Sequence, residues 1–465
     1  MVFSSLVFLG VFFASVLLLY NLSKNITYKN IILVIASLIF YAWGEPMWVL
    51  ALAFTGTSDY ILGRIIGKYF GKPQAKAALC ASVIIDVGIL AVFKYSGFIV
   101  ENINLITGGG LKIPVFGLPI GISFYTFQTL SYTIDTYRGK TEAQKSWISY
   151  MAYLSMFPQL VAGPIVRYVD VAKEIKSRSV TIEGFAYGAK RFVIGLGKKV
   201  LLANMAGDVA KLLFAEKALS SIAVGSAWLG LLMYTFQIYF DFAGYSDMAI
   251  GMGKMLGFNF PENFIYPYIS RSATEFWRRW HISLGSFFRD YVYIPLGGNR
   301  KRHIRNILVV WLLTGLWHGA SWNFILWGLY YGIILLIEKK CFGGKLLNLN
   351  KVVGTIYCFI LVMLGWGLFY FTDFGQLGIF FSHLFGFNAK LYDLMTVSAF
   401  TNNLWLIIAC VIASTPLPKI AYNKTIGKSK VADAVCSGIL MIAVFALCYI
   451  MLVGSTYNPF LYFRF

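Results

Sequence analysis

Long apolar runs alternate with short charged clusters along almost the whole chain, and this pattern restricts the fold more than any other feature. Charged residues make up only 13% of the sequence, and its mean hydropathy is +0.69. Soluble domains carry about 25% charged residues, so the chain is too apolar for a soluble fold of this length. The sequence therefore predicts an all-α integral membrane protein with about 10–13 tilted or re-entrant helices. Apolar runs suited to helices occupy about 3–20, 31–43, 47–66, 77–99, 115–136, 148–166, 184–214, 222–250, 305–338, 353–372, 402–418 and 434–454.

Basic residues between the apolar runs predict the orientation of the chain. The first run carries no preceding positive charge and no cleavage site, whereas Lys24 and Lys29 follow it. Because cytoplasmic loops are enriched in Lys and Arg, the N-terminus is expected outside the membrane and residues 21–30 in the cytoplasm. By the same rule, the basic clusters at 64–76, 137–147 and 419–430 are expected in the cytoplasm.

The segment 148–166 does not fit a simple crossing, because Arg167 and further basic residues follow it directly. Pro158, Gly163 and Pro164 interrupt its apolar run. Irregular backbone at membrane depth persists only where protein buries it or where it lines a cavity. We therefore expect a re-entrant or interfacial segment here. The chain contains no internal repeat and no low-complexity linker, so residues 1–465 are expected to form a single polytopic domain.

The net charge of +20 is explained by cytoplasmic loops that face anionic lipid. The basic residues are dispersed between apolar runs and do not form one basic domain, which argues against nucleic-acid binding. The six cysteines show no Cys-x-x-Cys pair and lie mostly in apolar runs, so they are expected to be small buried hydrophobic residues. Neither the cysteines nor the histidines have metal-ligand spacing, so no metal site is expected.

One of the four histidines, His318, lies in the segment Trp317-His318-Gly319 with apolar sequence on both sides. Residues 305–338 have the length of one long span or of a hairpin of two short helices, and on either reading His318 lies at membrane depth. Ionisable residues within membrane segments are rare and indicate function. A neutral imidazole there is suited to take a proton from a hydroxyl as a general base. The alternative is a structural histidine that donates to a backbone carbonyl between helices.

Two acids, Asp241 and Asp247, lie in the apolar run from Gln237 to Met248. Each would cost about 2.5–3.5 kcal/mol at the bilayer centre without a partner. We expect both to be structural, bonded to backbone or to basic groups on a neighbouring helix.

Basic residues outnumber acids between residues 271 and 305. This segment is expected either to lie at the cytoplasmic headgroups or to hold an anionic acyl donor with Arg278, Arg279 and Arg289, because guanidinium groups suit phosphates.

These segments together resemble the membrane-bound O-acyltransferase family, and within it the bacterial alginate O-acetylation type. The similar sequence runs from about residue 236 to 332. Within it, His318 matches the family's membrane-embedded histidine, and His281, in Trp-Arg-Arg-Trp-His, matches the family's second histidine. The segments 157–165 and 458–465 also look like family segments. One departure is Tyr331, where relatives often have histidine.

The resemblance implies a ring of helices around a central tunnel that contains His318. His318 and His281 would be catalytic, and Trp317 and Asn323 would support them. An acyl thioester such as acetyl-CoA would arrive from the cytoplasm as substrate, with no bound cofactor. A separate extracytoplasmic acetyltransferase would complete delivery to an exported polysaccharide or cell-wall polymer. The alternatives are the D-alanyl transfer protein of teichoic acid modification and, from another class, a transporter that uses His318 and the buried acids as a proton relay.

Overall fold

The computed structural model describes residues 1–114, 116–161, 163–215, 219–342, 350–387, 389–454 and 460–461. All secondary structure in these ranges is helical, which confirms the predicted all-α class. The chain forms two compact units. Among the described residues, unit 1 comprises those within 1–192 and 245–262, and unit 2 those within 193–244 and 263–461.

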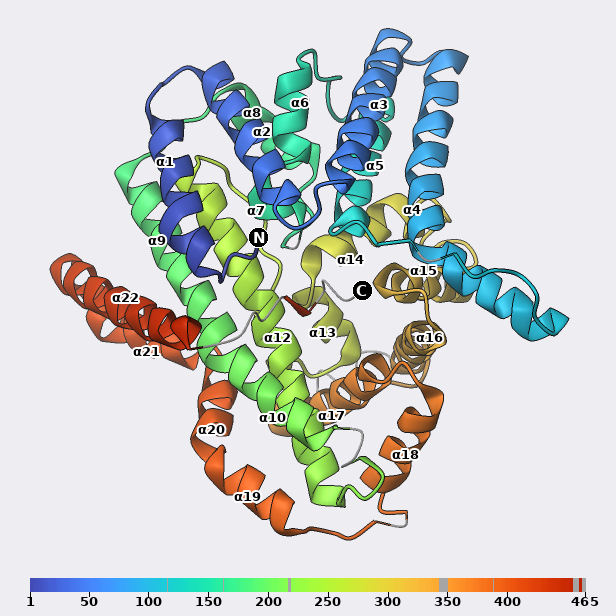
Figure 1. Cartoon of the computed structure of the whole chain (residues 1–465), viewed down its shortest axis with the longest axis vertical. Helices are drawn as coiled ribbons and strands as arrows, with labels where there is room; N and C mark the ends of the chain where they lie inside the picture. Colours follow the sequence, from blue (N-terminus) through green and yellow to red (C-terminus); the bar gives the residue numbers. More distant parts are fainter. Residues whose placement is uncertain are drawn as a thin grey trace. The chain divides into compact units, whose positions relative to one another are not determined.

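Unit 1 is built mainly from the first eight helices. In Figure 1, α2, α6, α3 and α5 lie alongside one another, and α2·α6, α3·α4, α4·α5 and α3·α5 are packed pairs. The helices of unit 1 are α1 (Phe13–Asn21), α2 (Ile26–Ala42), α3 (Trp48–Lys68), α4 (Pro73–Thr107), α5 (Ile122–Tyr137), α6 (Trp147–Leu154), α7 (Phe157–Leu160) and α8 (Tyr168–Lys176), preceded by a π-helical turn at Phe8–Phe12. Most of α9 (Ile182–Gly197) and the last part of α12 (Val224–Met255) also belong to it.

A buried carboxyl pair joins α3 and α4 inside unit 1. Asp59 and Asp86 are 0% and 1% exposed and lie within hydrogen-bonding reach of one another. Ser82 donates to Asp59 Oδ1 at 2.6 Å, and Thr129 of α5 donates to Asp86 Oδ2 at 2.6 Å. Neither acid forms an ion pair in the described part of the chain. The three helices are therefore linked by hydrogen bonds, which a low-dielectric interior strengthens.

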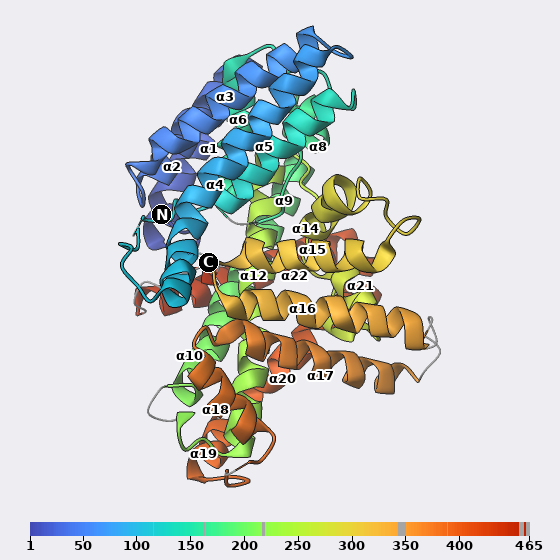
Figure 2. The same ribbon diagram turned by 90° about the vertical axis from the view of Figure 1, so that its right-hand side faces the viewer.

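Unit 2 contains the remaining helices. Figure 2 shows α15, α16 and α17 side by side, and α15·α16 and α16·α17 are packed pairs. Besides the first part of α12, the helices are α10 (Met205–Leu213), α13 (Ala273–Arg279), α14 (Ile282–Phe288), α15 (His303–His318), α16 (Trp322–Ile337), α17 (Lys351–Tyr370), α18 (Phe374–Leu384), α19 (Leu394–Asn402), α20 (Leu404–Ala413), α21 (Leu417–Lys424) and α22 (Lys430–Val453). Shorter π and 3₁₀ turns lie at Lys198–Asn204, Pro267–Ile269, Arg289–Tyr293, Glu338–Phe342 and Ile426–Lys428.

The run 305–338 forms a hairpin of two short helices. The chain turns between His318, the last residue of α15, and Trp322, the first residue of α16. Glycines make the close packing of this hairpin possible: a Cβ at Gly315 would clash with the carbonyl oxygen of Phe324, and one at Gly328 with that of Trp311. Small residues at a helix interface allow the backbones this close approach.

Four described helices are long and apolar enough to cross a membrane: α3, α4, α17 and residues 431–453 of α22. The pair α19 and α20, bent by 56°, would make a fifth. This number is below the predicted 10–13 because several expected runs are divided. Besides the hairpin, the run 184–214 becomes α9, the π turn Lys198–Asn204 and α10. In contrast, α4 is one helix of 35 residues, about 50 Å long, and it extends beyond both ends of the expected run 77–99.

The expected interruption of segment 148–166 is present. Helix α6 ends at Leu154, and α7 is a single turn that begins next to Pro158. Gly163 follows with φ +133, a backbone conformation that favours glycine. Residue 162 of this segment, and residues 458–459 and 462–465 of the C-terminal family segment, lie outside the described residues.

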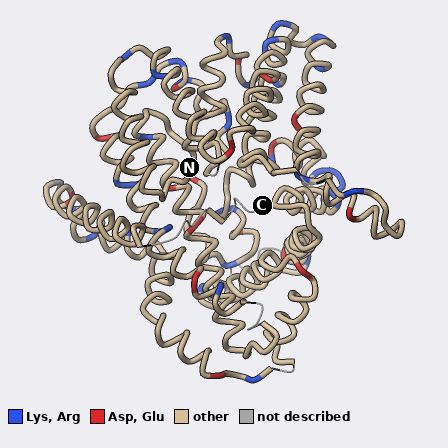
Figure 3. The backbone as a smooth tube through the Cα atoms, in the orientation of Figure 1, with Lys and Arg blue, Asp and Glu red and all other residues tan. Residues whose placement is uncertain are grey.

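Basic residues of unit 1 gather at helix ends, including the loops that join α3 to α4 and α5 to α6 (Figure 3). This distribution matches the loops expected at the cytoplasmic face, whereas the side on which they lie stays a prediction.

The cysteine prediction was partly wrong. Cys358, Cys410 and Cys448 are buried, but Cys80 and Cys341 are exposed. An apolar run does not distinguish a side chain that faces protein from one that faces lipid, because both environments suit the same residues.

Candidate active site

His318 lies at the C-terminal end of α15, where the hairpin turns. Its side chain is 3% exposed and is surrounded by aromatic rings. The ring centroids of Trp317, Trp327 and Phe369 lie 4.9, 4.9 and 5.1 Å from that of His318, all with edge-to-face geometry. The imidazole is therefore held in one orientation by residues of α15, α16 and α17.

His281 lies between α13 and α14, outside the candidate membrane spans. Its backbone adopts φ 43 and ψ 54, in the left-handed region. Among non-glycine residues in the described ranges, only Tyr266, His281 and Arg302 have positive φ. A non-glycine residue in the left-handed region stores backbone strain, and such strain is often found at functional sites.

A hydrogen-bond network fixes the ring of His281. Its Nδ1 lies 3.1 Å from Oδ1 of Asn263, which also accepts from Ser283 Oγ at 2.9 Å and from the Ser283 backbone at 3.2 Å. Because Asn263 Oδ1 is an acceptor, His281 Nδ1 carries the proton and Nε2 carries the lone pair. Nε2 is buried and has no hydrogen-bond partner in the described part of the chain. Burial lowers the pKa of His281 to about 3, so the ring is neutral at physiological pH.

The two histidines border the same indole. The ring centroid of Trp317 lies 5.7 Å from that of His281 and 4.9 Å from that of His318. On its other side His281 packs edge-to-face against Phe242 of α12, with a centroid separation of 4.7 Å. Residues 37 positions apart in sequence thus form one buried site inside unit 2.

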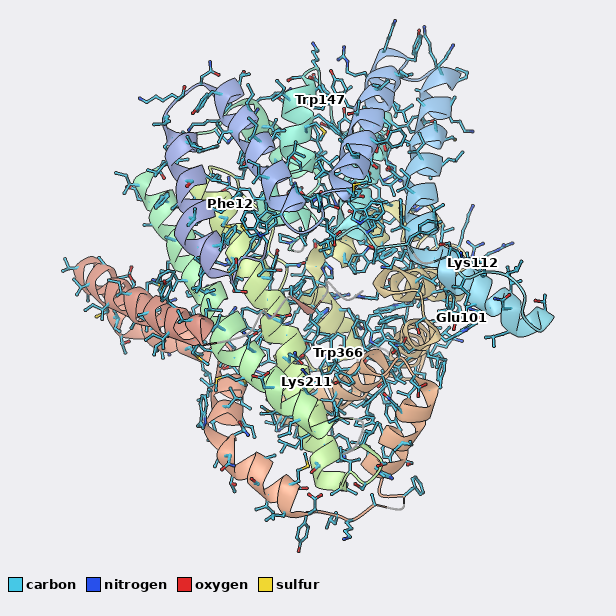
Figure 4. The ribbon with its side chains drawn as sticks, viewed as in Figure 1. Phe12, Glu101, Lys112, Trp147, Lys211 and Trp366 are labelled. Carbon is cyan, nitrogen blue, oxygen red and sulfur yellow. The ribbon has the colours of Figure 1, made fainter. Side chains whose placement is uncertain are left out.

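An aromatic cluster supports this site. Trp366, labelled in Figure 4, is fully buried and packs against Trp280 and Trp327 with centroid distances of 4.8 and 6.1 Å. Tyr331, the residue that departs from the family pattern, belongs to the same cluster and lies 4.7 Å from the ring of Trp277. Its side chain is fully buried.

Asn323 connects the hairpin to α17. It is 1% exposed, and its Nδ2 lies 3.3 Å from the carbonyl oxygens of both Leu368 and Phe369. Its Oδ1 is buried without a hydrogen-bond partner in the described residues. Asn323 therefore ties α16 to the end of α17 that carries Phe369, one of the rings around His318.

Both acids of α12 form ion pairs with basic residues on other elements. In unit 2, Asp241 Oδ1 lies 2.5 Å from Lys199 Nζ, and its Oδ2 accepts from the backbone nitrogen of Leu461 at 2.7 Å. In unit 1, Asp247 Oδ1 lies 2.6 Å from Arg191 Nη2. These ion pairs accord with a structural role for both acids.

The three candidate donor-binding arginines differ in their surroundings. Arg278 is exposed and forms no hydrogen bond or ion pair in the described part of the chain. Arg279 pairs with Glu275 at 2.7 Å, and Arg289, 63% exposed, pairs with Asp290 at 2.7 Å. All three follow or flank the strained turn at His281.

In the described ranges, no group of three or more His, Cys, Asp or Glu residues could hold a metal ion.

The family model of the membrane-bound O-acyltransferases matches residues 117–344, a range that starts in unit 1 and ends in unit 2 and contains both histidines. The chain is 38% identical to the probable alginate O-acetylase of Azotobacter vinelandii over the full length of both proteins. The chain belongs to the membrane-bound O-acyltransferase family. It is thus a membrane protein and an O-acyltransferase.

Two further relatives show how far the similarity extends. The peptidoglycan O-acetyltransferase of Helicobacter pylori is 34% identical over 78% of this chain and 75% of its own length. The teichoic acid D-alanyltransferase of Streptococcus thermophilus is 28% identical over 62% of this chain and 69% of its own length.

Two residues that position the site of this acyltransferase were missed in the sequence. Glu338, 4% exposed, accepts hydrogen bonds from the backbone nitrogens of Ala273 and Thr274 at 2.7 and 3.0 Å, and so holds the start of α13. Asn263 fixes His281 as described above. A lone acid directly after the apolar stretch of α16 was the signal for Glu338, whereas nothing local indicates the role of Asn263.

We expect Asn263→Asp to make acyl transfer sensitive to acid. The carboxylate accepts the same hydrogen bonds as the amide oxygen, but its charge favours imidazolium and raises the pKa of His281. If neutral His281 is required, activity should fall as the pH drops through this raised pKa, while the wild-type profile stays flat in that range. The measurement is the pH profile of acetyl transfer by both proteins. Identical profiles for two well-folded proteins would show that the protonation state of His281 does not matter.

Proposed function

We propose that this acyltransferase takes an acetyl group from a cytoplasmic thioester, with acetyl-CoA as the expected donor, and passes it across the membrane for O-acetylation of an exported polysaccharide or cell-wall polymer. The observation that carries the proposal is the buried pair of His318 and His281, which both contact the indole of Trp317. The relatives support the acceptor class, since their names specify alginate and peptidoglycan.

In this proposal His318 is the general base. It would accept the proton of the acceptor hydroxyl as that oxygen attacks the thioester carbonyl, and the thiol would leave with a proton. General base catalysis contributes about 10²–10⁴-fold to a rate. The aromatic rings around His318 support this role, because they exclude water from the imidazole and hold it in one orientation.

His281 would position the reacting groups beside His318. Its neutral ring presents a lone pair at Nε2, which would accept a hydrogen bond from the acyl-thioester substrate or from the hydroxyl that receives the acetyl group. Trp317 and Asn323 would keep the two histidines in register, Trp317 by packing between them and Asn323 through α17. Asp241 and Asp247 would stabilise the fold through their ion pairs and would take no part in the chemistry.

The basic segment of unit 2 would bind the phosphate groups of the donor. Arg278 is exposed beside the strained turn, and Arg300, Lys301, Arg302 and Arg305 are exposed further along. Asn306 holds the loop before α15 by donating to the carbonyls of Leu296, Gly298 and Lys301 at 3.2, 3.0 and 2.7 Å. A fixed loop that presents several guanidinium groups suits a phosphorylated ligand.

A partner and an orientation complete the proposal. The chain would lie in a bacterial plasma membrane with its N-terminus outside, as one polytopic domain. An extracytoplasmic acetyltransferase would receive the acetyl group and deliver it to the polymer. No bound cofactor is required, because the thioester is a substrate.

Two other functions are less well supported. D-Alanyl transfer to teichoic acid uses the same chemistry on an aminoacyl thioester, but the identity to the D-alanyltransferase is lower than to the O-acetylating relatives. A proton-coupled transporter would need the buried acids in a relay with His318. Asp241 is instead bound to Lys199 and Leu461, and Asp247 to Arg191.

The purified protein should consume acetyl-CoA and release free thiol in the presence of an acceptor polymer and its partner protein. Release of thiol with transfer of labelled acetyl is expected for the wild type, and D-alanyl thioester should be a poor substitute. Proton uptake into proteoliposomes without any thioester consumption would contradict the enzyme proposal and favour the transporter. Preference for D-alanyl thioester would favour the teichoic acid function.

Changing Arg278 to Ala should raise the KM for acetyl-CoA and leave the dependence on acceptor almost unchanged. Loss of one hydrogen bond to a charged group costs about 1.5–3 kcal/mol, so the KM should rise about tenfold or more. Arg289→Ala should act in the same direction. Arg279→Ala should also reduce the yield of folded protein, because it removes the partner of Glu275.

Lys419→Ala, at an exposed lysine of α21 in the same unit, is the matched control and should behave as wild type. Equal KM values for the wild type and Arg278→Ala would show that this segment serves only to anchor the protein at the lipid headgroups.

A further inference from the structure

Two basic side chains converge on one phenol ring in unit 1, away from the histidine pair. Lys29, in the first turn of α2, is only 7% exposed, and its Nζ lies 4.7 Å from the ring centroid of Tyr20. The Cζ of Arg178 lies 5.6 Å from the same centroid and 4.4 Å from that of Phe258. Four separate segments of the chain therefore meet at this cluster, which consists of Tyr20, Lys29, Arg178 and Phe258.

Hydrogen bonds hold the cluster in place. The hydroxyl of Tyr20 donates to the carbonyl oxygen of Leu256 at 2.6 Å and accepts from Nε of Arg178 at 2.6 Å. Nη1 of Arg178 donates to the backbone oxygen of Glu174 at 3.0 Å. Gly257, with φ +89, lets the turn after α12 approach residues 178 and 179. The position of the guanidinium is thus determined by neighbouring backbone and by Tyr20.

The positive charge of the cluster is not balanced by a carboxylate contact. Neither Lys29 nor Arg178 forms an ion pair in the described part of the chain, and Arg178 lies close enough to repel the charge of Lys29. Nη2 of Arg178 is buried there without a hydrogen-bond partner. Glu174 attracts Arg178, but its carboxylate accepts a hydrogen bond from Asn259 at 3.0 Å. Lys29 is buried and Arg178 is half-buried beside it, and two neighbouring cations removed from water are costly unless an anion accompanies them.

A cavity of about 370 Å³ adjoins the cluster, because Phe258 contacts Arg178 and also lines the cavity. Apolar and aromatic side chains form much of its wall, together with Lys254, whose Nζ donates to Asn259 at 2.6 Å. The acid in the lining, Glu262, is paired through both oxygens with Arg191, at 2.6 and 2.5 Å. The cavity therefore offers room for an amphipathic molecule whose anionic group meets Lys29 and Arg178.

We propose that Lys29 and Arg178 bind a phosphate group, with the adjoining cavity accommodating the part of the ligand next to it. The guanidinium fork and the ammonium supply charge-assisted hydrogen bonds to phosphate oxygens. In a membrane protein the phosphodiester of a lipid headgroup is the nearest abundant source, and the apolar wall of the cavity favours it over free phosphate. This site lies entirely within unit 1 and is independent of the proposed acetyl transfer.

Lys29→Met is the informative variant. Methionine keeps the side-chain length and its packing against Tyr20 but removes the charge, and the Lys29 side chain forms no hydrogen bond with the described residues that would be lost. Lys24→Met is the matched control, since Lys24 is exposed in the loop before α2. The melting temperature of delipidated protein in detergent is followed during titration with dihexanoyl phosphatidylglycerol or inorganic phosphate, at constant ionic strength with chloride as reference.

Phosphatidylglycerol is expected to raise the melting temperature of the wild type and of Lys24→Met. The affinity of Lys29→Met for this lipid should be lower by about tenfold or more, because a charge-assisted hydrogen bond is lost. Without ligand, Lys29→Met should melt no lower than the wild type, because it removes an unpaired buried charge. Stabilisation by the lipid alone identifies a headgroup site, and stabilisation by both probes identifies a phosphate site open to soluble anions. No shift with either probe, or an equal shift in Lys29→Met, would overturn the proposal.

Discussion

The close packing of α15 against α16 is the interaction on which the active site depends. Gly315 and Gly328 allow the two backbones to touch, and the turn between the helices leaves His318 at the end of α15. From that position the imidazole meets Trp327 of α16 and Phe369 of α17. A larger residue at either glycine would separate the helices and remove the rings that orient His318. The surroundings of His318 therefore depend on a backbone contact between two glycine-containing helices.

The second histidine, His281, is positioned by polar side chains through their hydrogen bonds within the fold. Glu338, at the end of α16, holds the start of α13, and α13 leads directly to the strained residue His281. Asn263 then fixes the tautomer of the ring. The acid of α12 nearest this site, Asp241, is neutralised by Lys199 and by a backbone nitrogen. The buried charges thus stabilise the surroundings of His281, whose own ring is neutral.

The sequence predicted the helical class and the nature of the partners of the acids, and it allowed the hairpin as one of two forms, whereas the catalytic role of His318 stays a prediction. Apolar periodicity and charge clusters carry that information locally. It did not predict the number of uninterrupted spans, since π turns such as Lys198–Asn204 divide apolar runs without a change in composition. It also missed Asn263 and Glu338, because their roles depend on contacts with residues 18 and 65 positions away. The exposure of Cys80, which lies in the apolar run 77–99, was beyond it for a related reason, since lipid and protein interior select the same apolar residues.

Acetyl transfer by a His318→Gln protein tests the central claim most directly. Glutamine can replace a structural hydrogen bond of the imidazole but cannot accept a proton at neutral pH. If His318 is the general base, the folded variant should lose about 10²–10⁴-fold in transfer rate, as much as His318→Ala. A well-folded His318→Gln protein that transfers acetyl at a near-normal rate would contradict the assignment and the mechanism built on it.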